Sequence, residues 1–191
     1  PVAQYRRYRP DRFHEVTQRV GFYRGALVTS VHAPVQRDMS LNRRSAHDNG
    51  GDAHLEKGCF VYMVDPWIKY DGYNETNYNF ESDYQLTLSR VSGYTGKYVI
   101  VRKKSGEALD EIPDDLDLVY IDGNHETEYV AKDVENYWKK LKHGGYLTGD
   151  DWSMPEVTSG ILLGFSKIVG ENNINQFNII YQGRNWVVQK P

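Results

Sequence analysis

The sequence contains one cysteine, no long apolar run and no strong net charge. Cys59 has no second cysteine with which to form an internal disulfide, so we expect a reducing, cytoplasmic environment. No stretch approaches the roughly 18 apolar residues of a membrane-spanning helix, and no membrane association is expected. The formal net charge of −3 gives no overall attraction to nucleic acid, so a nucleic-acid partner is not expected either.

Positive charge is concentrated near the N-terminus, where residues 1–13 form a predicted basic arm with four arginines between aromatic residues. A solvated terminal segment is the simpler interpretation of this arm, and contact with a phosphate or an acidic partner is the alternative. Residues 14–191 are expected to form one domain, because a chain of this length buries roughly 70% of its unfolded surface. The composition, 26% charged and 39% apolar, is typical of a globular protein.

Short apolar runs alternate with segments of helical periodicity along most of the chain. This pattern predicts an α/β fold with a mostly parallel sheet, which a C-terminal antiparallel hairpin with a three-residue turn completes to seven strands. His143-Gly144-Gly145 is expected to end one helix, and residues 38–58 are expected to form a long polar loop. The predicted strands are residues 14–20, 59–64, 98–101, 118–121, 146–149, 177–182 and 186–189, and the predicted helices are residues 26–36, 81–92, 127–142 and 155–169.

Three carboxylates follow two of the predicted strands, Asp122 after the first and Asp150 and Asp151 after the second. Ligands of open α/β sheets bind outside the carboxyl ends of the strands, so these acids are expected to converge at a binding edge. Carboxylates brought so close repel one another unless a cation compensates them. An all-oxygen set favours a hard divalent cation such as Mg²⁺. In the alternative, Asp150 and Asp151 only cap the following helix.

The segment VYIDGNHETEYVAKDVENYWKKLKHGGYLTGDDW, together with MVDPW and KKSGEAL, resembles class I S-adenosylmethionine-dependent methyltransferases. The similarity is greatest to the small metal-dependent O-methyltransferases of the macrocin and novobiocin sugar-tailoring type. This resemblance implies a Rossmann-like doubly wound fold, S-adenosylmethionine and Mg²⁺ as cofactors, and a small-molecule or sugar hydroxyl as acceptor. Arg19 departs from the pattern, because the family usually carries an acidic residue before the first glycine motif.

The resemblance also implies which residues contact the cofactor. Gly21 and Gly25 would approach the methionine part, although an ordinary tight turn explains them as well. Asp65 would accept the ribose hydroxyls, and its alternative is a strand-ending Asp-Pro turn. Trp67 would line the adenosine pocket or pack in the core, and Ser105 would contact the adenine or cap a short helix.

Asp122 would contact both the metal and the cofactor, and His125, three residues later, is the predicted general base. The alternative for His125 is an ordinary polar residue at a helix start. Four aromatic residues could form the wall of the acceptor site, namely Trp152, Tyr70, Tyr73 and Tyr78.

Other functions stay open at this stage. The same fold could act without a metal, or the domain could be a non-catalytic module that the basic arm ties to a larger assembly. A nicotinamide-dependent oxidoreductase is disfavoured, because the first turn lacks the G-x-G-x-x-G pattern. A homodimer is compatible with the sequence, which does not identify the acceptor.

Overall fold

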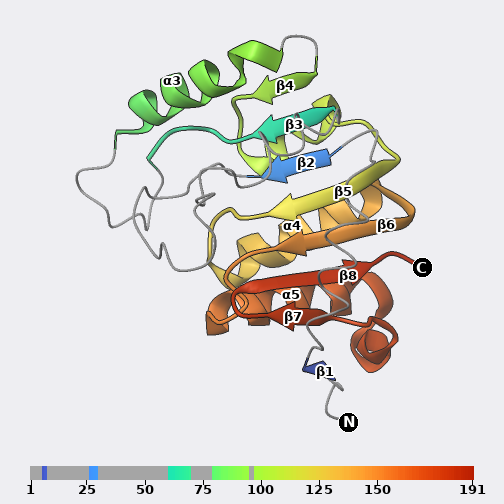
Figure 1. Ribbon diagram of the computed structural model, residues 1–191. Helices are drawn as coiled ribbons and strands as arrows, with labels where there is room; N and C mark the ends of the chain where they lie inside the picture. The colour runs from blue at the N-terminus through green and yellow to red at the C-terminus, as the bar shows by residue number, and fades with distance from the viewer. Residues whose placement is uncertain (1–5, 8–25, 30–59, 70–78, 95–96) are drawn as a thin grey trace.

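The computed structural model describes residues 6–7, 26–29, 60–69, 79–94 and 97–191 (Figure 1). The strands are β1 (Arg6–Arg7), β2 (Ala26–Thr29), β3 (Val61–Val64), β4 (Tyr98–Val101), β5 (Leu116–Ile121), β6 (Leu141–Gly149), β7 (Ile180–Gln182) and β8 (Asn185–Gln189). The α-helices are α3 (Phe80–Val91), α4 (Thr127–Lys140) and α5 (Pro155–Val169). Short 3₁₀ segments are η3 (Ser92–Tyr94), η4 (Ser105–Glu107), η5 (Leu109–Glu111) and η6 (Glu171–Gln176).

The strands described form one sheet in the order β1-β7-β8-β6-β5-β2-β3-β4. Strands β4, β3, β2, β5 and β6 run parallel, while β8 pairs antiparallel with both β6 and β7. The predicted α/β class and antiparallel hairpin are therefore confirmed. The described residues form eight strands where seven were predicted. Two of the eight were not predicted, Arg6–Arg7, which pairs parallel with β7, and Ala26–Thr29, while one predicted strand lies outside the described residues.

The sequence prediction fails in the N-terminal part of the sheet. Residues 26–36 were expected to form a helix, but Ala26–Thr29 is β2, a strand between β3 and β5. A run of four residues shows too little periodicity to distinguish a strand from a helix. Pairing with a strand on each side makes this segment a strand in the folded protein. The strand predicted at residues 14–20 and the loop predicted at 38–58 lie outside the described residues.

The end of α4 also differs from the prediction. The helix stops at Lys140, and His143-Gly144-Gly145 lies within β6 instead of capping the helix. Lys190, from the end of the chain, donates from Nζ to the carbonyl oxygens of Trp138 and Leu141 at 2.9 and 2.6 Å. A lysine from a distant part of the sequence therefore satisfies the carbonyls at the C-terminus of this helix.

The C-terminal hairpin has a two-residue turn, Gly183-Arg184, instead of the predicted three residues, because Gln182 pairs with Asn185. Gly183 has a φ of 60°, a conformation that glycine adopts at little cost. Since β8 is antiparallel to β6, this turn lies at the edge of the sheet where β6 ends. The predicted α5 and β4 are observed with the expected bounds, and α3 is observed within one residue of them.

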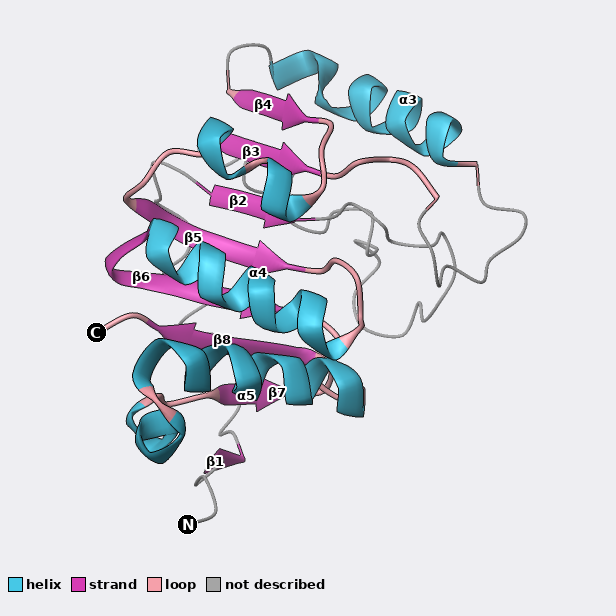
Figure 2. Ribbon diagram, turned by 180° about the vertical axis from the view of Figure 1, so that it is seen from behind, coloured by secondary structure: helices cyan, strands magenta, loops and turns pink. Residues whose placement is uncertain are grey.

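Helices cover both faces of the sheet. On one face α4 and α5 pack side by side, with residues such as Val134 and Ile161 fully buried against the strands (Figure 2). On the other face Val91 of α3 packs with Val61 and Met63 of β3. No helix among the residues described is long and apolar enough to span a membrane.

Candidate active site

The carboxyl ends of β5 and β6 place the predicted acids side by side. These parallel strands are neighbours, with Ile121 opposite Gly149, so Asp122 and Asp150 leave the sheet at the same level. The Asp150 amide continues the pairing by donating to the Ile121 carbonyl at 3.2 Å. Gly149 permits this approach, because a Cβ atom there would collide with the Ile121 carbonyl oxygen and would lie 2.8 Å from Nε1 of Trp186. The convergence predicted from the strand ends is thus observed for these two acids.

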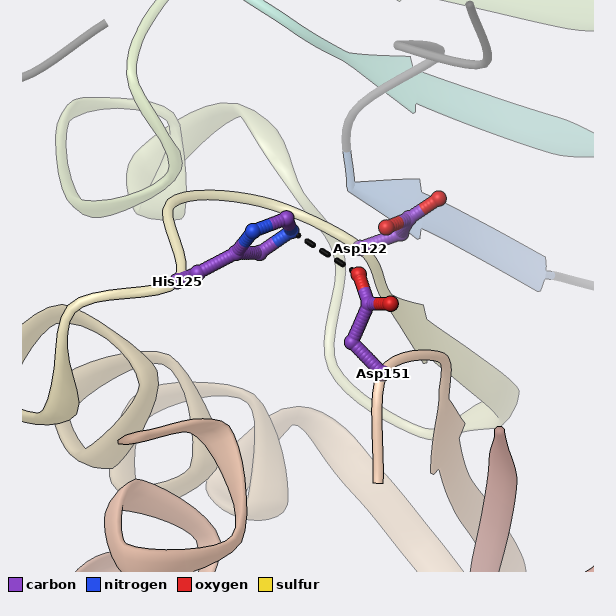
Figure 3. Close-up of side chains that lie close together, drawn as sticks. All are labelled: Asp122, His125 and Asp151. Carbon is purple, nitrogen blue, oxygen red and sulfur yellow. Dashed lines mark ion pairs between the residues drawn. The ribbon is translucent and has the colours of Figure 1, made fainter. Parts of the chain in front are cut away.

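His125 and Asp151 point toward one another beside Asp122 (Figure 3). The Nε2 atom of His125 lies 2.9 Å from Oδ2 of Asp151, and one ligand atom from each of the three residues falls within 4.8 Å of the others. Asp151 has a φ of 59°, a left-handed conformation that is uncommon outside glycine. Such a conformation is found where the surrounding structure holds it, often at functional sites.

Arg184, in the hairpin turn, is a member of this site that the sequence analysis missed. Its Nη2 atom forms an ion pair with Asp151 and lies 3.4 Å from Oδ2 of Asp150. A backbone hydrogen bond also joins the hairpin turn to the segment after β6, because the Trp152 amide donates to the Arg184 carbonyl at 2.7 Å. The available signal was the predicted hairpin, because a strand that returns antiparallel beside β6 begins at the edge where Asp150 lies.

The charges of the cluster alter the pKa values of its members. Burial raises the pKa of Asp122 to about 7, and the charges of Asp150 and Asp151 add to the increase. The hydrogen bond to Asp151 raises the pKa of His125 above its ordinary value. Burial opposes ionisation of Asp151, yet the hydrogen bond from His125 and the charge of Arg184 lower its pKa overall. The site therefore holds an excess of negative charge that these two side chains only partly offset.

Asp65 lies buried at the end of β3, where it was predicted to bind the cofactor. Its Oδ1 atom accepts the Trp67 amide at 2.6 Å, which stabilises the Asp-Pro turn. Trp67 is buried and packs against the ring of Tyr84, with centroids 5.0 Å apart. Core packing, the alternative to a pocket wall, is thus observed for Trp67. Its side-chain Nε1 has no hydrogen-bond partner among the residues that the structure describes.

Ser105 follows β4, at the same edge of the sheet, and contacts α4. Its hydroxyl donates to Oδ1 of Asp133 at 2.6 Å, and its carbonyl accepts the Tyr137 hydroxyl at 2.7 Å. Ser105 makes no cap for the short helix that it begins, so the capping alternative is wrong. Asp133 is buried, and this burial raises its pKa to about 6. Sequence analysis missed Asp133, because it lies on the apolar stripe of a helix.

Trp152, one of the predicted acceptor-wall residues, is half-buried and stacks on Tyr181 with centroids 5.0 Å apart. A small pocket adjoins this region and is lined by Asp122, His125 and Asp151, among others. Other predicted site residues lie outside the described part of the chain, namely Gly21, Gly25, Tyr70, Tyr73 and Tyr78. The glycine pair precedes β2 in the sequence, whereas the prediction placed a strand before it and a helix after it.

The strand order and the acids at the carboxyl edge are those of an open α/β sheet that binds its ligand at this edge. A family model described as a methyltransferase domain matches residues 20–152. The chain therefore belongs to the methyltransferase domain family.

One curated relative is an uncharacterized protein, R132, of Acanthamoeba polyphaga mimivirus. It is 29% identical over 70 residues, which are 37% of this chain and 32% of that protein. The alignment thus spans about a third of the length of that relative.

Several solved structures share the fold. An O-methyltransferase from Bacillus cereus in complex with S-adenosylhomocysteine matches with a TM-score of 0.55 at 13% identity, over 100% of this chain and 84% of that one. The TDP-rhamnose 3′-O-methyltransferase CalS11 of calicheamicin biosynthesis matches with a TM-score of 0.57 at 12% identity, over 95% and 81%. The methyltransferase MycE of mycinamycin biosynthesis, solved with Mg, S-adenosylhomocysteine and mycinamycin VI, matches with a TM-score of 0.52 at 14% identity, over 95% and 49%.

Proposed function

We propose that this protein transfers the methyl group of S-adenosylmethionine to a hydroxyl group of a small molecule or sugar, with the assistance of a divalent metal ion. The observation that carries the proposal is the cluster of Asp122, His125 and Asp151 at the carboxyl edge of β5 and β6. In this fold that edge is where a ligand binds. CalS11, which has the same fold, supports a sugar as acceptor because it is named as a TDP-rhamnose methyltransferase.

The donor set of the cluster fits a hard cation. Asp122, Asp150 and Asp151 offer carboxylate oxygens, the ligands that Mg²⁺ prefers. Burial, and after it the charges of Asp150 and Asp151, raise the pKa of Asp122, so a cation bound there would favour its ionised form. Bound there, a divalent ion would lower the pKa of a substrate hydroxyl and help to orient it.

His125 is proposed to accept the proton that leaves the acceptor hydroxyl. Asp151 holds the imidazole through Nε2 and stabilises its protonated form. A carboxylate in this position orients a histidine that acts as a base. A raised pKa makes His125 a stronger base, but the ring must be neutral before it can act. We therefore expect kcat/KM to increase with pH through the raised pKa of His125, and this dependence to disappear in His125→Ala.

The cofactor is proposed to lie across the carboxyl ends of β2, β3 and β5, where the order of the strands reverses. Asp65 would accept hydrogen bonds from the ribose hydroxyls, and Ser105 would contact the adenine through its backbone, because its hydroxyl donates to Asp133. Gly21, Gly25 and Trp67 stay in the proposal as contacts predicted from the family resemblance. Residues 14–191 would form the single domain that carries the site.

Transfer of a labelled methyl group tests the proposal. The protein is incubated with S-adenosylmethionine and a panel of nucleotide sugars and catechols, first with EDTA and then with Mg²⁺. Transfer that EDTA abolishes and Mg²⁺ restores supports the proposal. Transfer that EDTA does not affect contradicts the role of the metal. If calorimetry detects no binding at millimolar S-adenosylmethionine, the domain is instead a non-catalytic module.

A metal-independent methyltransferase is the second candidate, and one observation favours it. Arg184 already places a positive charge against Asp150 and Asp151, which is the task otherwise given to the ion. In this case His125 and the fixed charges alone would support the transfer. The comparison of EDTA with Mg²⁺ separates the two candidates directly.

A further inference from the structure

Arg184 forms one ion pair with Asp150 and another with Asp151. Both come from one nitrogen, Nη2, so a single guanidinium group bridges two consecutive carboxylates. Arginine remains protonated at any pH at which the protein is folded. The positive charge at this position is therefore permanent, unlike that of His125.

The position of Arg184 is fixed by its backbone, while its side chain extends into solvent. Its carbonyl accepts the Trp152 amide at 2.7 Å, and Gly183 before it forms the tight turn of the hairpin. The side chain nevertheless is 61% exposed, whereas that of Asp151 is 7% exposed. The guanidinium can thus leave the carboxylates by rotating into water, without unpacking any core residue.

Arg184 contacts two of the carboxyl groups that the proposed metal ion needs, through Oδ1 of Asp151 and Oδ2 of Asp150. A carboxylate oxygen already engaged by a guanidinium is a weaker ligand, and a positive charge within a few ångströms repels a second cation. The ion and the guanidinium therefore cannot both make their best contacts with Asp150 and Asp151. Occupation of the pair by one lowers its affinity for the other.

We infer that Arg184 is an internal counter-ion that competes with the divalent ion for Asp150 and Asp151. It stabilises the acidic pair while the ion is absent, and it weakens binding of the ion in proportion to the strength of its own contacts. This inference rests on the proposed metal-assisted function. In this role Arg184 sets the concentration of divalent ion at which the site is half occupied.

Binding of Mn²⁺ alone, measured by calorimetry and by the loss of the free-ion electron paramagnetic resonance signal, tests the inference. Arg184→Gln removes the charge and is expected to bind Mn²⁺ about tenfold more tightly than the unchanged protein, as the loss of one nearby charge predicts. Arg184→Lys keeps the charge without the bridging geometry, and its Mn²⁺ affinity is expected to lie between those of Arg184→Gln and the unchanged protein. Lys167→Gln is the matched control, because Lys167 is also an exposed cation paired with an acid, Glu128.

Thermal unfolding gives a second readout that does not depend on activity. In EDTA, Arg184→Gln is expected to have a lower Tm than the unchanged protein, and Mn²⁺ is expected to reverse the difference. Equal Mn²⁺ affinities for the two proteins would overturn the role of Arg184 and leave the metal-assisted function standing. If neither protein binds millimolar Mn²⁺ and methyl transfer is insensitive to EDTA, the proposed metal function fails, and the inference fails with it.

Discussion

Replacement of Asp122 by asparagine should stabilise the metal-free protein at high pH. The substitution keeps the shape of the side chain and removes one negative charge from a half-buried position. Burial and the charges of Asp150 and Asp151 raise the pKa of Asp122 to about 7 from an ordinary 3.8. The folded protein therefore holds the proton more tightly than the unfolded chain does, and ionisation of Asp122 opposes folding.

The size of the effect follows from the difference in pKa. About three pKa units correspond to about 4 kcal/mol of unfolding free energy, which is an upper value for this effect. The sign is that of a raised carboxyl pKa: the cost is absent below pH 4, grows as the pH rises, and is complete above about pH 7. Asp122→Asn should therefore match the unchanged protein near pH 4 and exceed it at pH 8. In a chain of this length, the difference at pH 8 is a Tm increase of up to roughly 10 °C.

Differential scanning calorimetry between pH 4.5 and pH 8, with EDTA and then with Mg²⁺, measures this effect. Asp133→Asn is the control, because burial raises the pKa of Asp133 to about 6 at a site away from the proposed ion. Both variants should gain stability at pH 8 in EDTA, but only Asp122→Asn should lose the stabilisation by Mg²⁺. A Tm difference between Asp122→Asn and the unchanged protein that is the same at both pH values would refute the reasoning.

Three further changes test other parts of the structure. Gly160→Ala should lower the free energy of unfolding by about 1–3 kcal/mol in urea titrations, because the new Cβ would lie 2.6 Å from Cβ of Val130. The control Gly106→Ala should have little effect, because a Cβ atom at Gly106 would lie in open space. Lys190→Met should lower the Tm by several degrees through loss of two hydrogen bonds to helix-end carbonyls, and an unchanged Tm would contradict that role. Asp65→Asn should weaken S-adenosylmethionine binding about tenfold in calorimetry with little change in Tm, and equal affinity would exclude Asp65 from the cofactor site.

Local patterns in the sequence were sufficient for several elements in the central and C-terminal parts of the fold. The apolar run that contains Val61–Val64 predicts a strand and Pro155 the start of the last helix, and the structure confirms both. The prediction failed at Ala26–Thr29, where three apolar residues and a threonine fit a strand or a helix equally well. It also failed at Gly144, because a glycine after a helix is a common stop but can equally lie in a strand.

The sequence by itself indicated that acids follow two strands and that His125 comes three residues after the first of these acids. Only the tertiary structure decided how these charges are paired, with Asp151 bound to His125 and both Asp150 and Asp151 contacted by Arg184. Arg184 lies 33 residues after Asp151, and only the pairing of β8 with β6 brings the two together. A strand end can be recognised from a few adjacent residues, whereas a contact between distant charges depends on the order and direction of all the strands between them.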